Sequence, residues 1–144
     1  MVNKKVQVVI FRKQLNSWEV LLLQTNVRRG EFWQNVTGSL EDVDQQIVDG
    51  AFREVLEETS MEKTAVLKFS SLPLEYKFRD QWQRDVEEFT FCFVVESNAK
   101  VKIDSSEHQN YQWIKCDMIK KDHYKYPSNF EVFEAGLNWV KQND

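Results

Sequence analysis

This sequence has little cysteine, no long apolar run and no excess of positive charge. Its two cysteines, Cys92 and Cys116, form no C-x-x-C pair and have no zinc-ligand spacing, so we interpret them as buried, reduced side chains. The longest apolar run, 89–95, is too short to cross a bilayer, and residues 1–11 hold no hydrophobic stretch long enough for a secretion signal. We therefore expect a cytoplasmic protein with no membrane partner.

The charge balance narrows the class of partner. Lys and Arg number 19 against 23 Asp and Glu, which leaves a net charge of −4. A nucleic-acid-binding face needs a basic stripe, and the sequence has none, so no nucleic-acid partner is expected. A small phosphorylated substrate stays open, because bound metal ions can reverse the local field.

What is present is an ordinary globular composition, 42% hydrophobic and 29% charged. The length suits one domain, 1–144, with a proper core. Val, Ile and Leu concentrate at 5–11 and 18–24, and this pattern predicts a β-hairpin. A short strand at 32–37 should run into a turn at Gly38. Further strands are expected at 65–69, 74–78, 89–95 and 111–115, with an edge near 101–103.

Two helices are predicted between and after these strands. The first covers 45–59, with Asp42 and Gln45 as an acidic capping box. The second begins at Ser128, with Glu131 as its capping partner. Strands dominate and the helices are few, so the predicted class is α+β, with a mixed β-sheet between helices.

The most informative segment is Arg-Glu-Val-Leu-Glu-Glu at 53–58. It puts Glu54, Glu57 and Glu58 at positions i, i+3 and i+4, which on a helix is one face. Like charges at this spacing repel and reduce stability unless something neutralises them. Carboxylate oxygens are the ligands that Mg²⁺ and Mn²⁺ prefer, so this face is a candidate metal site.

A solvated acidic surface, with Arg53 paired to Glu57, is the alternative explanation. Two features of the context favour the metal site. A glycine turn at Gly38 precedes the helix, and a further acid, Glu107, lies far downstream.

The segment resembles the signature of the Nudix hydrolase family. That signature reads Gly, five residues, Glu, seven residues, then Arg-Glu-apolar-any-Glu-Glu-any-Gly-apolar. The matching residues here are Gly38, Arg53, Glu54, Val55, Glu57, Glu58 and Met61. The resemblance covers essentially the whole chain, and it implies a Nudix sandwich in which a loop-helix-loop holds the metal.

The sequence departs from that signature in two places. The spacing from Gly38 to Arg53 is one residue longer, so the signature glutamate falls on Asp44 or on Gln45, depending on the direction of counting. An insertion within 42–44 reconciles both counts, and we expect its cost to be structural. The signature's last glycine is Ser60, although a left-handed helix end favours glycine.

The family resemblance implies a Mg²⁺ site, with Mn²⁺ as a substitute. It places metal ligands at Glu54, Glu57 and Glu58, with the carbonyl of Gly38 as a further ligand. Arg53 would orient the glutamates through charge-assisted hydrogen bonds. The implied reaction is hydrolysis of a phosphoanhydride, with Glu54 or Glu107 as the carboxylate that activates water.

Two other segments resemble one branch of the family, the bacterial dihydroneopterin triphosphate pyrophosphatases, which are also described as dATP pyrophosphohydrolases. These segments are Phe-Trp-Gln-Asn-Val-Thr-Gly-Ser at 32–39 and Glu-His-x-x-Tyr-x-Trp at 107–113. The resemblance implies that Glu107 is a metal ligand and that Thr37 contacts substrate. Trp33 and Gln34 are further candidates for substrate binding.

An arginine that this branch places after the second strand is not matched. Gln24 is followed by Thr25 and Asn26. Arg28 and Arg29, in the loop that follows, are the candidates to replace it.

The leading hypothesis is therefore a Mg²⁺-dependent enzyme that cleaves dATP or dihydroneopterin triphosphate and releases pyrophosphate. Dinucleoside polyphosphates and the 5′-triphosphate end of RNA remain alternative substrates. A catalytically silent domain that only binds a nucleotide is a third reading, although the retained acids argue against it. The resemblance also allows a homodimer, which no motif decides.

Overall fold

The computed structural model describes residues 2–144, and a mixed β-sheet forms its centre. Along the chain the strands and helices are β1 (Asn3–Gln14), β2 (Ser17–Thr25), β3 (Trp33–Gln34), β4 (Val36–Ser39), α1 (Ile47–Thr59), β5 (Val66–Arg79), β6 (Asp85–Val95), β7 (His108–Lys115) and α2 (Pro127–Gln142). The predicted hairpin and the α+β class are confirmed.

The two ends of β1 pair with different strands, and this arrangement positions the elements that carry the candidate site. One end of β1 pairs antiparallel with β2, from Phe11 to Gln14, while the other end, from Lys5 to Val8, pairs with β4. On its other side β1 pairs with β6, and this contact is parallel, so the sheet is mixed as predicted. β2 pairs with β7 along Glu19–Thr25, including residues that also pair with β1, and beyond the point where β1 and β2 separate it pairs with β3 at Leu23 and Gln24.

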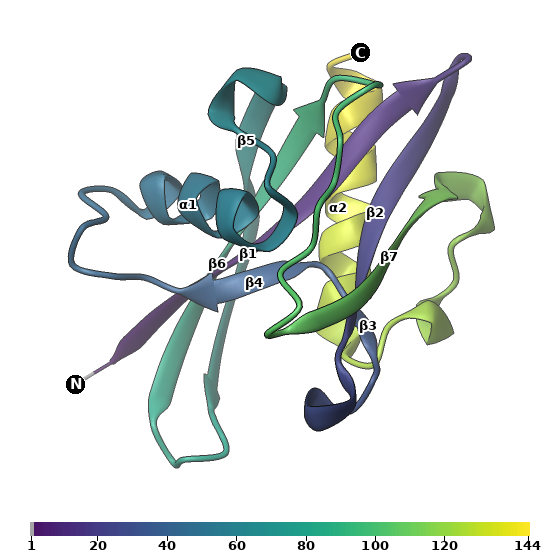
Figure 1. Ribbon diagram of the computed structural model, residues 1–144. Coiled ribbons are helices and arrows are strands. Elements are labelled where there is room, and N and C mark those ends of the chain that lie inside the picture. Colours follow the sequence, from purple (N-terminus) through teal and green to yellow (C-terminus); the bar gives the residue numbers. More distant parts are fainter. Residues whose placement is uncertain (1) are drawn as a thin grey trace.

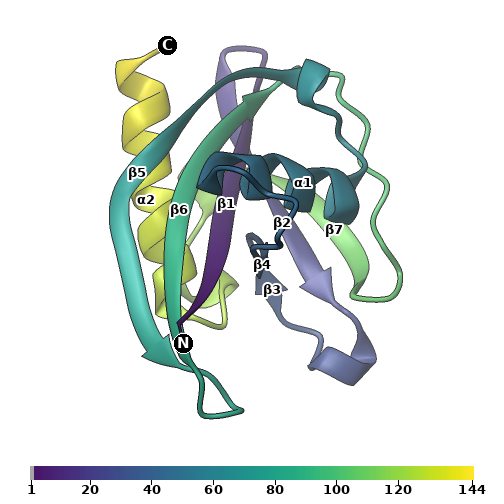
Figure 2. The same ribbon diagram turned by 90° about the vertical axis from the view of Figure 1, so that its left-hand side faces the viewer.

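The two helices cover opposite faces of the sheet (Figures 1 and 2). On the α1 face, a buried cluster includes Val8, Val55 and Phe93. On the α2 face, a second cluster includes Phe11, Cys92 and Val132. Successive residues of a strand point to opposite faces, so neighbours in β1, β2 and β6 belong to different clusters. Cys92 and Cys116 are both free and buried, as predicted.

The predicted start of α1 is wrong. The helix begins at Ile47 with Gln46 as its N-cap, and the backbone N–H of Gln46 donates to the carboxylate of Asp49 at 2.9 Å. Asp42 and Gln45 do not cap it. Asp49 lies inside the first turn, where a carboxylate also interacts favourably with the helix dipole.

The predicted start of α2 is wrong as well. The N-cap is Tyr126 and the helix begins at Pro127, whose fixed φ suits a first helical position. Glu131 instead accepts a hydrogen bond from the Tyr76 hydroxyl at 2.7 Å. None of the helices within residues 2–144 has the length and apolar character that a membrane span requires.

Two strand predictions also need correction. The two strands expected at 65–69 and 74–78 are one strand, β5, with an irregular register between Ser71 and Glu75. The expected edge at 101–103 is an extended segment outside the sheet. Its apolar side chains pack on the α1 cluster, and the Lys102 N–H donates to the Thr59 carbonyl at 2.9 Å, which ties the segment to the end of α1.

Candidate functional site

Helix α1 does not present its acids to solvent as a uniform face. Glu54 and Glu58 are buried, whereas the side chain of Glu57 is half exposed. Ala51 and Val55 pack into the core beneath them. The helix therefore carries two carboxylates into the protein, which argues against a simply solvated acidic surface.

Arg53 donates hydrogen bonds to several carboxylates of the acid cluster. Its guanidinium donates to Glu54 at 2.9 Å, to Glu57 at 3.1 Å and to Glu41 at 3.2 Å. It also donates to both oxygens of Asp44, at 2.9 and 3.0 Å, and to the Ser39 carbonyl at 2.8 Å. These contacts, led by Asp44, raise the pKa of Arg53 further above its ordinary value. A planar fork of donors is suited to such a set of acceptors.

Asp44 is the residue that holds the loop before α1 in place. Its carboxylate is bound by Arg53, which lowers the pKa of Asp44, and it accepts the Glu41 N–H at 2.9 Å. A Cβ on Gly50 would lie 2.2 Å from a methyl of Leu40 and 3.1 Å from Asp44. The glycine within the helix is therefore required for the loop to pack closely. Of the two counts along the signature, the forward count to Asp44 matches this role.

Gly38 lies directly against Glu54. A Cβ at Gly38 would meet the Glu54 carboxyl carbon at 2.0 Å. Any side chain at Gly38 would displace this carboxylate, so the close approach of β4 and α1 requires glycine here. The predicted proximity of Gly38 and Glu54 is thus present in the structure.

Glu58 is the acid of this group whose carboxylate has the fewest hydrogen-bond donors around it. It is 1% exposed, and within residues 2–144 neither of its carboxylate oxygens has a hydrogen-bond partner. Burial first, then the Glu54 carboxyl group, to which a protonated Glu58 can donate a hydrogen bond, and then the charges of Glu54 and Glu107 raise its pKa well above the usual range. Burial also raises the pKa of Glu54. A buried carboxylate without donors is costly unless it is protonated or bound to a cation.

The nearest nitrogen to Glu58 cannot compensate its charge at neutral pH. His108 Nε2 lies 3.7 Å from Glu58 Oε1 and 3.1 Å from the amide nitrogen of Gln34. Burial, followed by the charge of Arg29, lowers the pKa of His108 to about 4. The imidazole is therefore neutral at pH 7 and does not offset a negative charge on Glu58.

Glu107 approaches the acids from the far side. It follows an extended segment and is held by the 3-10 turn at Val27–Arg29. The Asn26 N–H donates to the Glu107 carbonyl at 2.9 Å, and the side chains of Asn26 and Arg28 both donate to the Ser106 carbonyl. The Glu107 carboxylate lies 3.6 Å from Arg29. Of the two arginines proposed for this loop, Arg29 is the one beside the acids.

A further acid was missed by sequence reasoning. Ligand oxygens of Glu41, Glu54 and Glu57 lie within 4.8 Å of one another, the one such acidic group found in the described chain. Glu41 reaches it because the Arg53–Asp44 contact folds the loop back onto α1. Only its position three residues after Gly38 could have pointed to it. Glu58 and Glu107 are not members of this compact group.

The predicted substrate residues separate into two sets. Thr37 and Gln34 line a cavity of about 640 Å³, and Arg29 and Phe32 line it too. Trp33 is not among its lining residues and packs on the α2 cluster instead. The structure therefore brings Phe32, not its neighbour Trp33, to the cavity.

Ser60 adopts the left-handed conformation that the signature glycine would suit. Its φ is 64°, its N–H donates to the Leu56 carbonyl, and its hydroxyl donates to the Lys102 carbonyl at 2.9 Å. The helix thus ends in the same geometry with a serine. The hydroxyl hydrogen bond compensates part of the strain of a left-handed non-glycine residue.

The family of this chain follows from a match to a family model over most of its length. The family model that describes the NUDIX domain matches residues 1–135. The chain belongs to the Nudix family. Its mixed sheet, its two helices and the acid-bearing loop-helix-loop are those of Nudix hydrolase structures, and the chain is an enzyme of the pyrophosphohydrolase class.

Solved structures show the same Nudix fold. An E. coli dihydroneopterin triphosphate pyrophosphohydrolase is 25% identical with a TM-score of 0.71, covering 91% of this chain and 92% of that one. A Nudix hydrolase from Listeria monocytogenes is 23% identical with a TM-score of 0.82, over 97% and 95%. An Ap4A hydrolase from C. elegans is 17% identical with a TM-score of 0.79, over 97% and 98%. A search of curated protein sequences found no match.

Proposed function

We propose that this Nudix enzyme hydrolyses a phosphoanhydride bond of a small triphosphate, either a nucleoside triphosphate or dihydroneopterin triphosphate, and releases pyrophosphate. The observation that carries the proposal is the position of Glu58. It is a buried carboxylate without a hydrogen-bond donor in the described chain, and it lies among other acids. A cavity large enough for a ring is lined by Arg29, which lies 3.6 Å from the Glu107 carboxylate. The resemblance to the dihydroneopterin triphosphate enzyme supports the choice of substrate.

The acids fit a divalent cation. The proposed ligands are Glu54, Glu57, Glu58 and Glu107 with the Gly38 carbonyl, and Glu41 joins Glu54 and Glu57 in their compact group. The donor set is all oxygen, which suits Mg²⁺ and, as a substitute, Mn²⁺. When bound, such an ion polarises the phosphoryl oxygens and lowers the pKa of water.

The chain's own residues have separate tasks in this proposal. Arg53 positions Glu54 and Glu57 through its hydrogen bonds. Arg29, which lines the cavity and lies beside Glu107, binds the phosphate chain. A water molecule attacks the phosphorus next to the organic group and the bridging P–O bond breaks. Pyrophosphate then leaves, and Glu54 or Glu107 accepts the proton of the water.

The test is turnover by the purified protein with Mg²⁺. The panel contains dihydroneopterin triphosphate, dATP, dGTP, Ap4A and 5′-triphosphorylated RNA, with EDTA as the metal-free control. We expect pyrophosphate and a monophosphate from the first three, and ¹⁸O from labelled water in the monophosphate. Tight nucleotide binding without turnover of any substrate would show a silent domain and overturn the proposal.

The two candidate bases are separated in the same assay. Glu54→Gln and Glu107→Gln are compared by kcat at saturating Mg²⁺ across pH. Loss of the acidic limb of the pH profile in one variant identifies that carboxylate as the proton acceptor. A profile retained in both variants would remove both residues from this role.

A further inference from the structure

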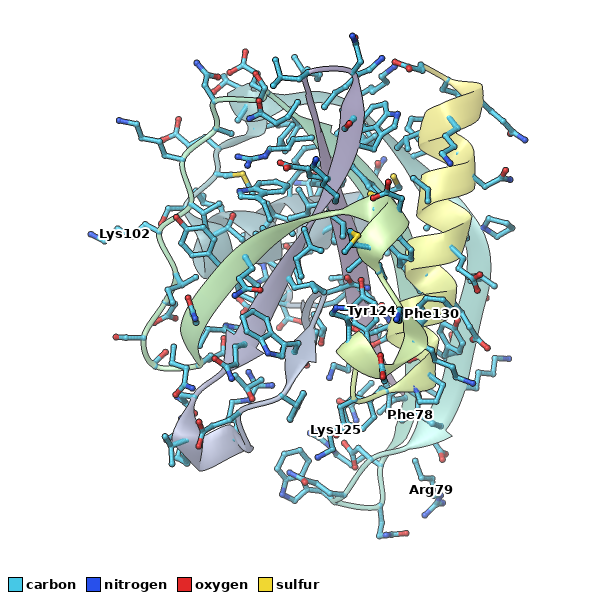
Figure 3. The ribbon with its side chains drawn as sticks, turned by 90° about the vertical axis from the view of Figure 1, so that its right-hand side faces the viewer. Phe78, Arg79, Lys102, Tyr124, Lys125 and Phe130 are labelled. Carbon is cyan, nitrogen blue, oxygen red and sulfur yellow. The ribbon has the colours of Figure 1, made fainter. Side chains whose placement is uncertain are left out.

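The cavity lies on the other side of β4 from the acids. Gly38 faces Glu54, whereas Thr37, the preceding residue of the strand, lines the cavity. The remaining walls come from β6, from the start of α2 and from the hairpin between β5 and β6. Figure 3 shows Phe78 and Arg79, at the end of β5, and Lys125, just before α2, at this same end of the molecule.

A buried carboxylate lines this cavity. Glu88 of β6 is 7% exposed and lies opposite Lys5 of β1 in the strand register. Its Oε1 accepts a hydrogen bond from the Gln7 amide at 2.8 Å. Within residues 2–144 no donor is assigned to Oε2, and that atom is not among the fully buried polar atoms. One oxygen is thus held by the protein and the other is free to accept from a ligand.

The contacts of Asn35 fix the orientation of the Gln7 side-chain amide. The Gln7 carbonyl oxygen accepts from the Asn35 amide at 2.8 Å, so the Gln7 amide nitrogen must point at Glu88. Asn35 is itself anchored to Asn129 of α2, whose side-chain oxygen accepts the Asn35 N–H at 2.8 Å. A network with fixed donors and acceptors recognises one pattern of ligand groups and rejects others.

The aromatic walls suit a flat ring. Phe32 and Tyr126 meet edge to face with centroids 5.4 Å apart, and Lys125 lies 4.7 Å above the Phe32 ring. Trp82, at the tip of the β5–β6 hairpin, is exposed and lines the cavity as well. Aromatic faces such as these bind bases by stacking and leave the choice between bases to polar groups.

An ionised carboxylate only accepts hydrogen bonds. It therefore matches a ring edge that carries two adjacent N–H donors, which is the 2-amino-4-oxopyrimidine edge of guanine and of pterins. Adenine has a ring nitrogen acceptor beside its amino group, and that acceptor would face the carboxylate unpaired. We propose that Glu88 selects substrates with a 2-amino-4-oxopyrimidine ring over adenine. This inference rests on the proposed hydrolysis and specifies the ring of its substrate.

The charged neighbours of Glu88 are compatible with an ionised group in the assay. Burial raises the pKa of Glu88, whereas the Gln7 hydrogen bond and the Lys5 charge lower it. Tyr76, opposite Glu88 on β5, has its pKa raised and remains neutral. Binding is therefore measured at pH 8, because a higher pH favours the ionised form of the Glu88 carboxyl group.

The experiment measures equilibrium binding without metal. Isothermal titration in EDTA compares dGMP, dIMP, which lacks the 2-amino group, and dAMP. We expect dGMP to bind about 10- to 100-fold more tightly than dAMP, with dIMP between them. The three nucleotides differ in the hydrogen bonds that their rings can donate to the charged Glu88 carboxylate. Neopterin is expected to compete with dGMP, since both rings carry the same edge.

Two variants assign the discrimination to one residue. Glu88→Gln keeps the size and the Gln7 contact but offers one donor and one acceptor, so the preference for dGMP over dAMP should fall to about threefold or less. Glu87→Gln makes the same change at the adjacent position of β6, outside the lining of this cavity, and should keep the wild-type ratio.

Equal affinity for dGMP and dAMP in the wild type would overturn the inference. So would an unchanged ratio in Glu88→Gln, or no measurable binding of either nucleotide at millimolar concentration. These results are independent of turnover, because no metal is present. An active enzyme without ring discrimination would contradict this inference alone, and discrimination without hydrolysis would contradict only the proposed reaction.

Discussion

Two buried glutamates, Glu58 on α1 and Glu88 on β6, differ in what surrounds their oxygens. Burial raises the pKa of both. Glu58 has no hydrogen-bond donor in the described chain and lies among other acids. Glu88 has one oxygen held by Gln7, within a network that reaches α2.

This difference teaches that burial alone does not assign a role to a carboxylate. An acid without donors among like charges must be protonated or bound to a cation, because no donor of the described chain balances its charge. An acid with one satisfied oxygen and a neighbouring lysine is already stable enough to be kept in a binding cavity. The donors around each group therefore indicate whether it is suited to a metal or to a ring.

The largest expected effect comes from Glu58→Gln. Losing a carboxylate among the proposed metal ligands should reduce kcat by a factor on the order of 10³. Mg²⁺ should raise the melting temperature of the wild type and fail to raise that of the variant. Steady-state kinetics and thermal unfolding with and without Mg²⁺ measure both. Glu62→Gln, an exposed acid just after α1, is the control. An unchanged rate would remove Glu58 from the site.

The next effect tests how the acids are held together. Arg53→Lys removes the planar fork that contacts Asp44, Glu54 and Glu57, and should lower the free energy of unfolding by about 2–4 kcal/mol. The loss should be larger in EDTA than in Mg²⁺, because no other cation then offsets the acids. Urea unfolding measures it.

Arg12→Lys provides the comparison for Arg53. Arg12 contacts a single carboxylate, Glu19, and should lose less than about 1 kcal/mol. Equal losses in the two variants would contradict the special role of the Arg53 cluster.

A smaller effect concerns the pH dependence of stability on the Glu88 side. A raised pKa means that the folded protein keeps the Glu88 proton when the unfolded chain has released it. The free energy of unfolding therefore falls as pH rises from about 4.3 through the folded-state pKa, by at most about 1.4 kcal/mol per pH unit. Glu88→Gln should remove this part of the slope. Urea unfolding in EDTA between pH 4 and pH 8 measures the free energy of unfolding of the wild type and of Glu88→Gln. If the prediction is wrong, the two plots of this free energy against pH are parallel.

The smallest effect lies at the end of the acid-bearing helix. Ser60→Gly relieves the left-handed strain but loses the hydrogen bond to the Lys102 carbonyl and adds flexibility to the unfolded chain. The two effects should offset to within about 1 kcal/mol in urea unfolding. Ser60→Ala loses the hydrogen bond to the Lys102 carbonyl and keeps the left-handed strain, so it should be less stable than Ser60→Gly. The opposite order would show that the hydroxyl contributes nothing.

Sequence reasoning succeeds where the relevant spacing is local. Glu54, Glu57 and Glu58 follow from the helical repeat, and the hairpin follows from two apolar runs separated by a polar segment. Asp44 was left undecided because its role depends on the path of a loop. The placement of Glu41 depends on that same path, since Arg53 determines where the loop lies.

The rest depends on contacts between distant parts of the chain. Glu88 and Gln7 are 81 positions apart, and nothing in either neighbourhood indicates their hydrogen bond. The position of Trp33 outside the lining of the cavity was missed for a different reason. A two-residue strand is too short to show which of its neighbours points into a cavity. The helix starts were misplaced because Pro127 and Asp49 compete with the serine and aspartate that also suit a cap.

Strand β4 constrains where the chain can change in length during evolution. Thr37 pairs with Gln7 and Gly38 pairs with Val6, so adjacent positions serve the ring cavity and the acid site. One residue inserted within β4 ahead of Gly38 would exchange these two sides. The loop after Gly38 already carries an additional residue relative to the signature, and Arg53 still holds it. Insertions should therefore be tolerated after this strand and eliminated within it.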